Sequence, residues 1–270
     1  MTAVATRLAI ALLFAAWALP LYWMLAASLT PEAALFETPS LLPASPVADH
    51  YRALFTERQF WRPVLNSLVV AGVTTLLAIA VAVPCAYAMA RLRFRGRAAL
   101  MAGVLAISMF PQISIVPPLF LLLRSVGLID TVPGLVLPYL TFATPLAVWL
   151  MTGFFRDLPV DLEDAARMDG ATRWRAAVLV AVPIAAPAVA TTAILTFLYA
   201  WNEFLFALSF TVSPDRHTVP VAIALFRGRY QVPWGQILAA AVTASVPVAI
   251  VVLAFQKRIV KGLTAGAVKG

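Results

Sequence analysis

Residues 160–183, VDLEDAARMDGATRWRAAVLVAVP, form a short charged segment between two long apolar runs. Its ionisable residues are Asp161, Glu163, Asp164, Arg167, Asp169, Arg173 and Arg175. In the chain of 270 residues as a whole, 62% are hydrophobic and only 12% are charged. Because charged side chains are costly in the hydrocarbon of a membrane, we expect this segment at an aqueous surface, where a partner protein can bind it.

The composition predicts an integral membrane protein. The mean hydropathy is +0.91, and the apolar runs are too many for a soluble core of this size to bury. The formal net charge of +8 does not indicate a nucleic-acid partner, since the basic residues lie in short loops rather than on a basic helix. We expect them to orient the chain in the bilayer instead.

Uncharged runs long enough to cross ~30 Å of hydrocarbon recur along the chain. They cover residues 8–31, 63–90, 98–123, 131–155, 176–202 and 230–256. Their apolar residues are continuous rather than alternating, which favours helices over barrel strands, and their internal prolines predict kinks. The predicted fold class is therefore an all-α polytopic membrane protein with six transmembrane helices, the first of them a retained helix and not a signal peptide.

The runs divide the chain into three parts. Residues 1–62 hold the first helix and an external loop, and residues 63–258 form a five-helix core that includes the charged loop 157–176. Residues 259–270 form a C-terminal tail. If both termini are cytoplasmic, 13 of the 20 Lys and Arg residues lie inside, four of them in the run RLRFRGR at 91–97. This bias favours a cytoplasmic charged segment in a multi-pass protein of the cytoplasmic membrane.

Within the charged segment the sequence predicts a short helix. Pro159 suits a first turn, acidic residues follow it near the positive end of the helix dipole, and Glu163 to Arg167 is an i,i+4 pair. Gly170 can end the helix in a left-handed conformation, and Thr172 can cap the next helix. These features also fit an ordinary capped loop helix without a partner.

Several motifs resemble the permease subunits of ABC importers. These subunits share an EAA loop, usually written EAA, three residues, G, nine residues, I-x-L-P. This chain has a similar pattern at Asp164-Ala165-Ala166, Gly170 and 180–183 (VAVP). Here Asp replaces Glu, and Val replaces both Ile and Leu. Four segments resemble the carbohydrate branch of these permeases, and they are closest to the second permease of maltose-type and trehalose-type pairs. The segments are EDAARMDGA, NSLVVAGVTTLLAIAVAVPCAYAMAR, LIDT at 128–131 and WNEF at 201–204.

This resemblance implies a transport subunit without catalytic chemistry, an ABC importer permease fold and a cytoplasmic coupling helix. The residues expected to couple to an ATPase are Glu163, Asp164, Ala165, Ala166, Arg167, Asp169 and Gly170. Glu163 and Asp164 would make polar docking contacts. The implied partners are two ATPase subunits, a second homologous permease, an extracytoplasmic solute-binding protein, lipid and the sugar. ATP and Mg would bind the ATPase, because this sequence has no phosphate-binding G-x-x-x-x-G-K-[ST] loop.

A second candidate site surrounds Glu203, the only residue between 176 and 214 that is charged at neutral pH. A carboxylate at membrane depth is costly unless it faces water or a partner, so we expect a substrate path there. The candidate path residues are Tyr199, Asn202, Glu203 and Gln112. Alternatively, Glu203 caps its helix or pairs with Arg227 or Arg229.

Other functions remain open at this stage. A secondary transporter would need ion ligands on several membrane helices, and a membrane hydrolase would need His, Cys or an acid pair at membrane depth. His50 and His217, the only histidines, fall in predicted loops, where we expect them to be solvated. Neither metal nor cofactor is expected on this chain. An ABC permease for another solute, such as glycerol phosphate or a peptide, is the remaining alternative.

Overall fold

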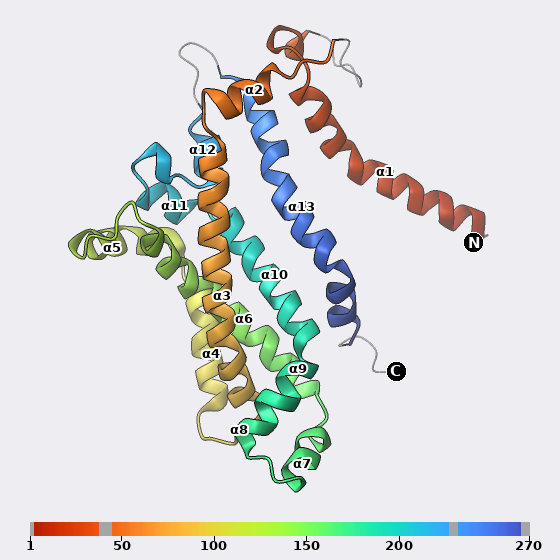
Figure 1. The fold of residues 1–270 in the computed structure, drawn as a ribbon, viewed down its shortest axis with the longest axis vertical. Helices are drawn as coiled ribbons and strands as arrows, with labels where there is room; N and C mark the ends of the chain where they lie inside the picture. Colours follow the sequence, from red (N-terminus) through yellow and green to blue (C-terminus); the bar gives the residue numbers. More distant parts are fainter. Residues whose placement is uncertain (1–2, 38–44, 227–231, 266–270) are drawn as a thin grey trace.

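The computed structural model describes residues 3–37, 45–226 and 232–265. All regular structure in these ranges is helical, and the helices form an elongated bundle with α7 at one end and α2 at the other (Figure 1). In chain order the elements are α1 (Ala3–Ser28), the 3₁₀ turn η1 (Glu32–Phe36), α2 (Asp49–Thr56), α3 (Trp61–Arg91), α4 (Arg97–Ser108), α5 (Gln112–Ser125), α6 (Val132–Asp157), α7 (Asp161–Met168), α8 (Arg173–Ala176), the π turn η2 (Ala177–Ala181), α9 (Val182–Ile184), α10 (Ala186–Asn202), α11 (Leu205–Phe210), the 3₁₀ turn η3 (Pro214–Arg216), α12 (Val219–Ala224) and α13 (Trp234–Ala265).

Four of the described helices are long and apolar enough to cross a membrane, namely α1, α3, α6 and α13. The count rises to six if two bent pairs of helices each make one span: α4 with α5, bent by 85°, and the α8–α9 segment with α10, bent by 71°. The apolar runs therefore predicted where the spans lie. In that case two of the six spans are broken rather than continuous.

Prolines explain both breaks. Pro111 has an extended backbone (φ −61°, ψ 113°) immediately before α5, and a proline disfavours helical geometry in the residue that precedes it. The second break follows the π turn at Ala177–Ala181 and lies between Pro183 and Pro187. Each proline removes one backbone donor from the helical ladder, so the chain bends at these points.

The core lies where α3, α6 and α10 pack together, and α11 packs against α6 at its side. Tyr139 of α6 and Phe206 and Phe210 of α11 are fully buried. The rings of Phe206 and Phe210 stack with their centroids 5.7 Å apart. These contacts fix α11 and the end of α10 that precedes it, where the sequence predicts a substrate path.

Helix α1 stands apart from this core along most of its length (Figure 1). Its membrane-length apolar stretch has no buried residues in this chain, and only Ala26, Ala27 and Ser28 at its C-terminal end are buried. The hydroxyls of Ser28 and Tyr51 are hydrogen-bonded at 2.7 Å, which ties this end of α1 to α2. Its remaining apolar surface is open to lipid or to another chain.

The α2 end of the bundle is fastened to α13 by polar contacts. Both oxygens of the Glu32 carboxylate accept backbone hydrogen bonds at 2.9 Å, one from Trp234 and one from Gly235. His50 lies against Gly235 and forms a hydrogen bond through Nε2 with the carbonyl of Thr30 at 2.9 Å. The expectation of a solvated His50 was wrong, because α2 packs on α13 and buries the imidazole.

Replacement of Gly235 by Ala should destabilise the protein. The added Cβ would collide with the His50 ring, and overpacking of this kind costs about 1–3 kcal/mol. Gly72→Ala in α3 is the matched control, because its Cβ would meet no atom within 4 Å, and it should be neutral or slightly stabilising. Thermal unfolding of the two purified variants in detergent measures the difference. Equal melting temperatures would contradict the close packing of His50.

Candidate functional site

The charged segment forms helix α7 at the tip of the molecule (Figure 1). Its first turn carries three acidic residues, Asp161, Glu163 and Asp164, which suits the positive end of a helix dipole. Helix α8 starts directly after Thr172, whose side-chain oxygen accepts from the backbone N–H of Arg175 at 3.3 Å. The predicted helix and the predicted Thr172 cap are both confirmed.

The turn after α7 depends on Gly170. This glycine has φ +88°, a left-handed conformation that most side chains disfavour, as the sequence predicted. The amide of Gly170 donates to the carbonyl of Arg167 at 3.1 Å, and that of Ala171 donates to the carbonyl of Ala166 at 3.0 Å. This pair of bonds is the Schellman motif, which satisfies the last carbonyls of a helix and reverses the chain sharply.

Adjacent carboxylates on α7 face different environments. The Glu163 side chain is only 7% exposed, and it lies against the end of α3. Its Oε1 accepts from Arg91 Nε and its Oε2 accepts from the Tyr87 hydroxyl, both at 2.6 Å. Arg91 also donates through Nη2 to the carbonyl of Leu158 at 2.8 Å.

These contacts correct two expectations from the sequence. Arg167 pairs with Asp164, at 3.0 Å and three residues apart, and not with Glu163. Glu163 faces α3, so its carboxylate is not on the surface that could dock a partner. The pattern on α7 alone favoured the local pair, because the competing cation, Arg91, is 72 residues away in the sequence.

The outward surface of α7 combines charge with exposed apolar atoms. Asp164 and Arg167 have side chains that are 53% and 47% exposed. Ala165, Asp169 and Gly170 are exposed, whereas Ala166 is partly buried. Three large apolar side chains that the sequence did not single out are also exposed in this segment: Met168 (89%) and Leu162 (41%) on α7, and Trp174 (69%) on α8. Large apolar residues within a strongly polar segment were the signal that could have identified them.

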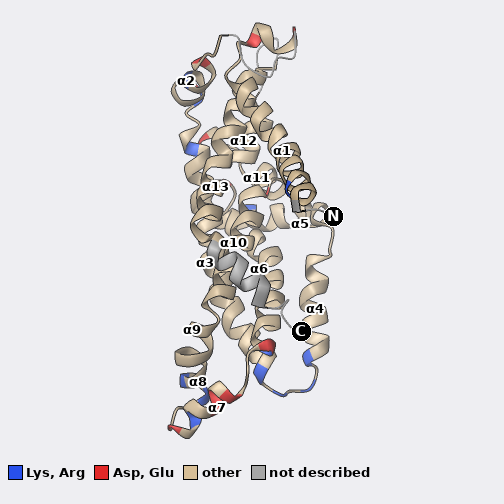
Figure 2. Ribbon diagram, turned by 90° about the vertical axis from the view of Figure 1, so that its right-hand side faces the viewer, with Lys and Arg blue, Asp and Glu red and all other residues tan. Residues whose placement is uncertain are grey.

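Charged residues gather near the two ends of the bundle, and the segments between them carry few (Figure 2). At the α7 end, the exposed residues Arg93 and Arg95 belong to the connection between α3 and α4. At the other end, Asp130 accepts backbone hydrogen bonds from Val212 at 2.9 Å and Ser213 at 3.1 Å. Burial raises the pKa of Asp130, but these bonds and one from the Ser213 hydroxyl outweigh it, so the pKa lies below its usual value.

Glu203 lies in the break between α10 and α11 and is 7% exposed. Its carboxylate accepts from the backbone N–H of Phe206 at 2.8 Å and of Ala207 at 3.1 Å. It thus caps the first turn of α11, in line with the capping alternative that the sequence left open. Arg227 and Arg229, the alternative partners, lie outside the described residues.

The four candidate path residues line one depression, of about 550 Å³, together with Leu198, Phe204 and Leu205. Gln112, at the start of α5, donates to the Tyr199 hydroxyl at 2.9 Å. Asn202 is exposed and donates to the carbonyl of Leu198 in its own helix at 2.8 Å. The structure therefore brings these residues together, although Glu203 directs its carboxylate toward α11.

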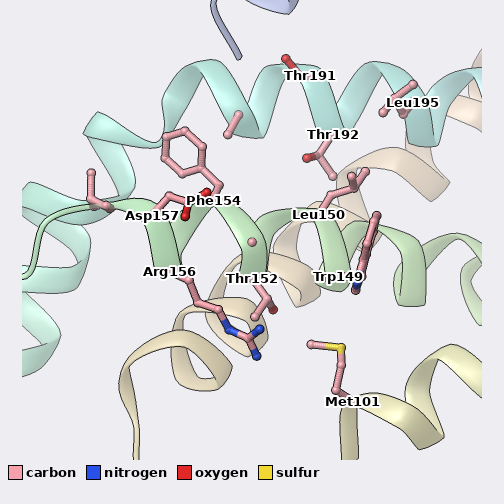
Figure 3. Close-up of a pocket in the computed structure, with 13 residues that line it drawn as sticks. Met101, Trp149, Leu150, Thr152, Phe154, Arg156, Asp157, Thr191, Thr192 and Leu195 are labelled. Atoms are coloured by element: carbon pink, nitrogen blue, oxygen red, sulfur yellow. The ribbon is translucent and has the colours of Figure 1, made fainter. Parts of the chain in front are cut away.

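A second pocket, which the sequence did not reveal, opens between α4, α6 and α10 and has a volume of about 480 Å³. Figure 3 shows Trp149 of α6 projecting toward Met101 of α4, and Thr192 of α10 projecting toward α6. Trp149 is 50% exposed. The lining of the pocket is mixed: besides apolar side chains it includes Thr152, Thr191, Thr192, Arg156 and Asp157.

The pocket and the depression lie along the same face of α10. Ala188, Thr191, Thr192 and Leu195 line the pocket, and Leu198, Tyr199 and Asn202 line the depression. Steps of three or four residues place side chains on the same side of a helix. From residue 188 to residue 202 this stripe rises about 21 Å along the helix axis.

Comparison with known proteins adds independent information. Residues 78–265 match the family described as binding-protein-dependent transport system inner membrane component. The trehalose transport system permease protein SugB of Mycobacterium tuberculosis is 46% identical over 93% of this chain and 92% of its own length. The trehalose/maltose permease MalG of Thermococcus litoralis is 40% identical over 93% and 91%, and the sulfoquinovosyl glycerol permease SmoH of Agrobacterium fabrum is 41% identical over 93% and 88%.

The fold is also found in a solved structure, a bacterial ABC transporter involved in the import of the acidic polysaccharide alginate. The TM-score is 0.77, with 23% identity over 94% of this chain and 95% of the matched chain. A further alginate ABC transporter, solved in complex with an alginate pentasaccharide-bound periplasmic protein, gives a TM-score of 0.68 at 17% identity, over 93% and 92% of the two chains. At this level of identity the agreement concerns the fold alone.

Removal of the Glu203 carboxylate should destabilise the break between α10 and α11. Glu203→Ala leaves two buried N–H groups without their acceptor, at about 1–3 kcal/mol for each unsatisfied group, and Glu203→Gln should be milder because one acceptor oxygen remains. Thermal unfolding in detergent measures the loss. Asn202→Ala is the control, since its exposed amide bonds only to its own helix. If Glu203→Ala melts like the wild type, the capping role is wrong.

Proposed function

The chain belongs to the family of inner membrane components of binding-protein-dependent transport systems, and from this membership we propose that it is one of two permease subunits of an ATP-driven importer for a di- or oligosaccharide. The relatives named above are permeases for trehalose, for trehalose and maltose, and for sulfoquinovosyl glycerol. A further relative, 34% identical, is a diacetylchitobiose permease. All these solutes carry sugar rings, and this shared chemistry supports a saccharide as the substrate.

Within the structure, the observation that carries this proposal is the stripe along α10. The stripe joins a pocket beside Trp149 to a depression that contains Gln112, Tyr199 and Asn202. Aromatic faces suit the apolar faces of sugar rings, while amides and hydroxyls exchange hydrogen bonds with sugar hydroxyls. In the proposed importer this stripe is one wall of the translocation path, and the second permease supplies the opposite wall.

Energy for transport comes from other subunits in this proposal. The sequence contains no G-x-x-x-x-G-K-[ST] loop, so ATP and its Mg would bind to two partner ATPases. Helix α7 is the proposed coupling helix, which presents Asp164, Ala165, Arg167 and Met168 to the ATPase. Their mixture of charge and exposed apolar surface suits a protein contact.

This arrangement assigns a direction to the bundle. The α7 end, with the arginine run at 91–97, would lie in the cytoplasm together with both termini, in accordance with the positive-inside rule. The opposite end, with α2 and α12, would meet the extracytoplasmic solute-binding protein. The C-terminal tail is a further proposed contact for the ATPase, although its residues 266–270 lie outside the described part of the chain.

Substitutions on the outward face of α7 should weaken coupling. Ala165→Asp adds a charge at an exposed position, and Gly170→Asp strains a left-handed turn, so each should lower sugar uptake and ATPase co-purification about tenfold while expression remains normal. Gly96→Asp is the matched control, because Gly96 has a similar φ of +85° in the connection between α3 and α4. Normal uptake by the Ala165 and Gly170 variants would contradict the assignment of α7.

Truncation of Trp149 should impair transport without loss of assembly. Trp149→Ala removes the exposed aromatic face of the pocket, and uptake should fall about tenfold at sugar concentrations below saturation. Trp149→Phe should retain most of the uptake. Leu137→Ala is the control, since Leu137 is equally exposed on α6 and does not line the pocket. Wild-type uptake by a fully assembled Trp149→Ala complex would exclude this pocket from the path.

A further inference from the structure

Helix α7 is held to α3 by a small polar cluster, here called the α3–α7 joint. It consists of Tyr87 and Arg91 near the end of α3, Glu163 of α7 and the carbonyl of Leu158. Three hydrogen bonds of 2.6–2.8 Å connect these groups. Both oxygens of the Glu163 carboxylate are used, so the bonds fix the position and the rotation of α7 relative to α3.

The ion pair of the joint is largely shielded from water, whereas Tyr87 is half-buried. The Arg91 and Glu163 side chains are 11% and 7% exposed, whereas the neighbouring pair of Asp164 and Arg167 is about half exposed. Exposed ion pairs contribute little because solvent screens them. In a buried pair, by contrast, the loss of one partner leaves an unpaired charge. A separation of α3 from α7 is therefore disfavoured, and the two helices are held together as one unit.

The joint supplies a connection that the chain itself lacks. Helix α7 is linked covalently to α6 through residues 158–160 and to α8 through residues 169–172. Helix α3 ends at Arg91, and 69 residues, 92–160, separate it from the start of α7 at Asp161. Movement of α7 can thus reach α6 and α10 through the backbone, whereas the joint connects it to α3 by direct hydrogen bonds.

The far end of α3 is bonded to the opposite end of the bundle. The Asn66 side-chain amide donates to the carbonyls of Asp215 at 2.7 Å and His217 at 3.0 Å. The Ser67 hydroxyl accepts from the buried N–H of Val219 at 2.8 Å. Since the 31 residues of α3 span about 46 Å, one continuous helix, with Pro84 inside it, connects α7 to residues 215–219 at the other end.

We propose that Tyr87, Arg91 and Glu163 are positioning residues that make α3 move with the coupling helix, so that displacement of α7 also displaces the segment 215–219. This inference rests on the proposed function, because it requires α7 to receive force from an ATPase. A helix with discrete bonds at both ends can pass a displacement from one end to the other. The joint thus acts on the coupling of ATP hydrolysis to transport and not on binding of the ATPase.

The test uses the complete importer, with both permeases, the ATPases and the binding protein, in proteoliposomes. Uptake of sugar and release of phosphate are measured together. Glu163→Gln and Tyr87→Phe should raise the ATP consumed per sugar about tenfold and about threefold, respectively, since the first change weakens a charged bond and the second removes one hydrogen bond. ATPase co-purification and the sugar concentration for half-maximal uptake should be unchanged.

Two matched controls separate this effect from others. Tyr51→Phe removes a hydroxyl hydrogen bond of similar length at the opposite end of the molecule, to Ser28, and should leave the ratio of ATP to sugar unchanged. Asp164→Asn alters the exposed carboxylate next to Glu163 and should lower ATPase co-purification instead. Glu163 and Asp164 are neighbours on α7, but their variants would then give different defects. Glu163→Gln would raise the ratio of ATP to sugar, and Asp164→Asn would lower ATPase co-purification.

A double variant keeps the test decisive if single variants fail to fold. Arg91→Met with Glu163→Met fills the joint with apolar side chains, which often replace a buried ion pair without loss of stability. Its ratio of ATP to sugar should rise as in Glu163→Gln. A wild-type ratio in the folded double variant, or in folded Glu163→Gln, would overturn the inference. A wild-type complex without ATP-dependent sugar uptake would instead refute the proposed function.

Discussion

Backbone amides at membrane depth must find acceptors within the protein, and the break between α10 and α11 depends on how this demand is met. The N–H groups of Phe206 and Ala207 are buried, so they need acceptors within the protein. The Glu203 carboxylate accepts from both of them, so α10 can stop at Asn202 and α11 can start three residues later. This capping also leaves Tyr199 and Asn202 beside an open depression, where an unbroken helix would have continued past them.

Features set by local sequence were predicted well. The apolar runs located the four continuous spans and the two bent helix pairs, because a membrane-length stretch of apolar residues has few alternatives to a helix in lipid. Helix α7, its left-handed Gly170 and the Thr172 cap were also predicted, since each depends on residues within one turn of the chain. The sequence named Gln112 and Tyr199 only as separate candidates for the substrate path, and it did not predict the hydrogen bond that joins α5 to α10.

Features set by packing between distant segments were missed. The i,i+4 rule favoured Arg167 as the partner of Glu163. In the structure Glu163 is buried against α3 and pairs with Arg91, and Arg167 pairs with Asp164. His50 was placed in solvent, because nothing near it in the sequence shows that Gly235 leaves room for its ring. The pocket at Trp149 depends on the relative placement of α4, α6 and α10, which no local pattern specifies.

An eight-residue helix is marginal on its own, so the orientation of α7 must come from its surroundings. The Schellman turn at Gly170 fixes its exit, and the bonds of Glu163 fix its rotation about its axis. Rotation matters because consecutive residues on a helix differ by about 100°. With Glu163 held against α3, Asp164 must point to solvent, so the bond that attaches α7 to the bundle also presents its outward face.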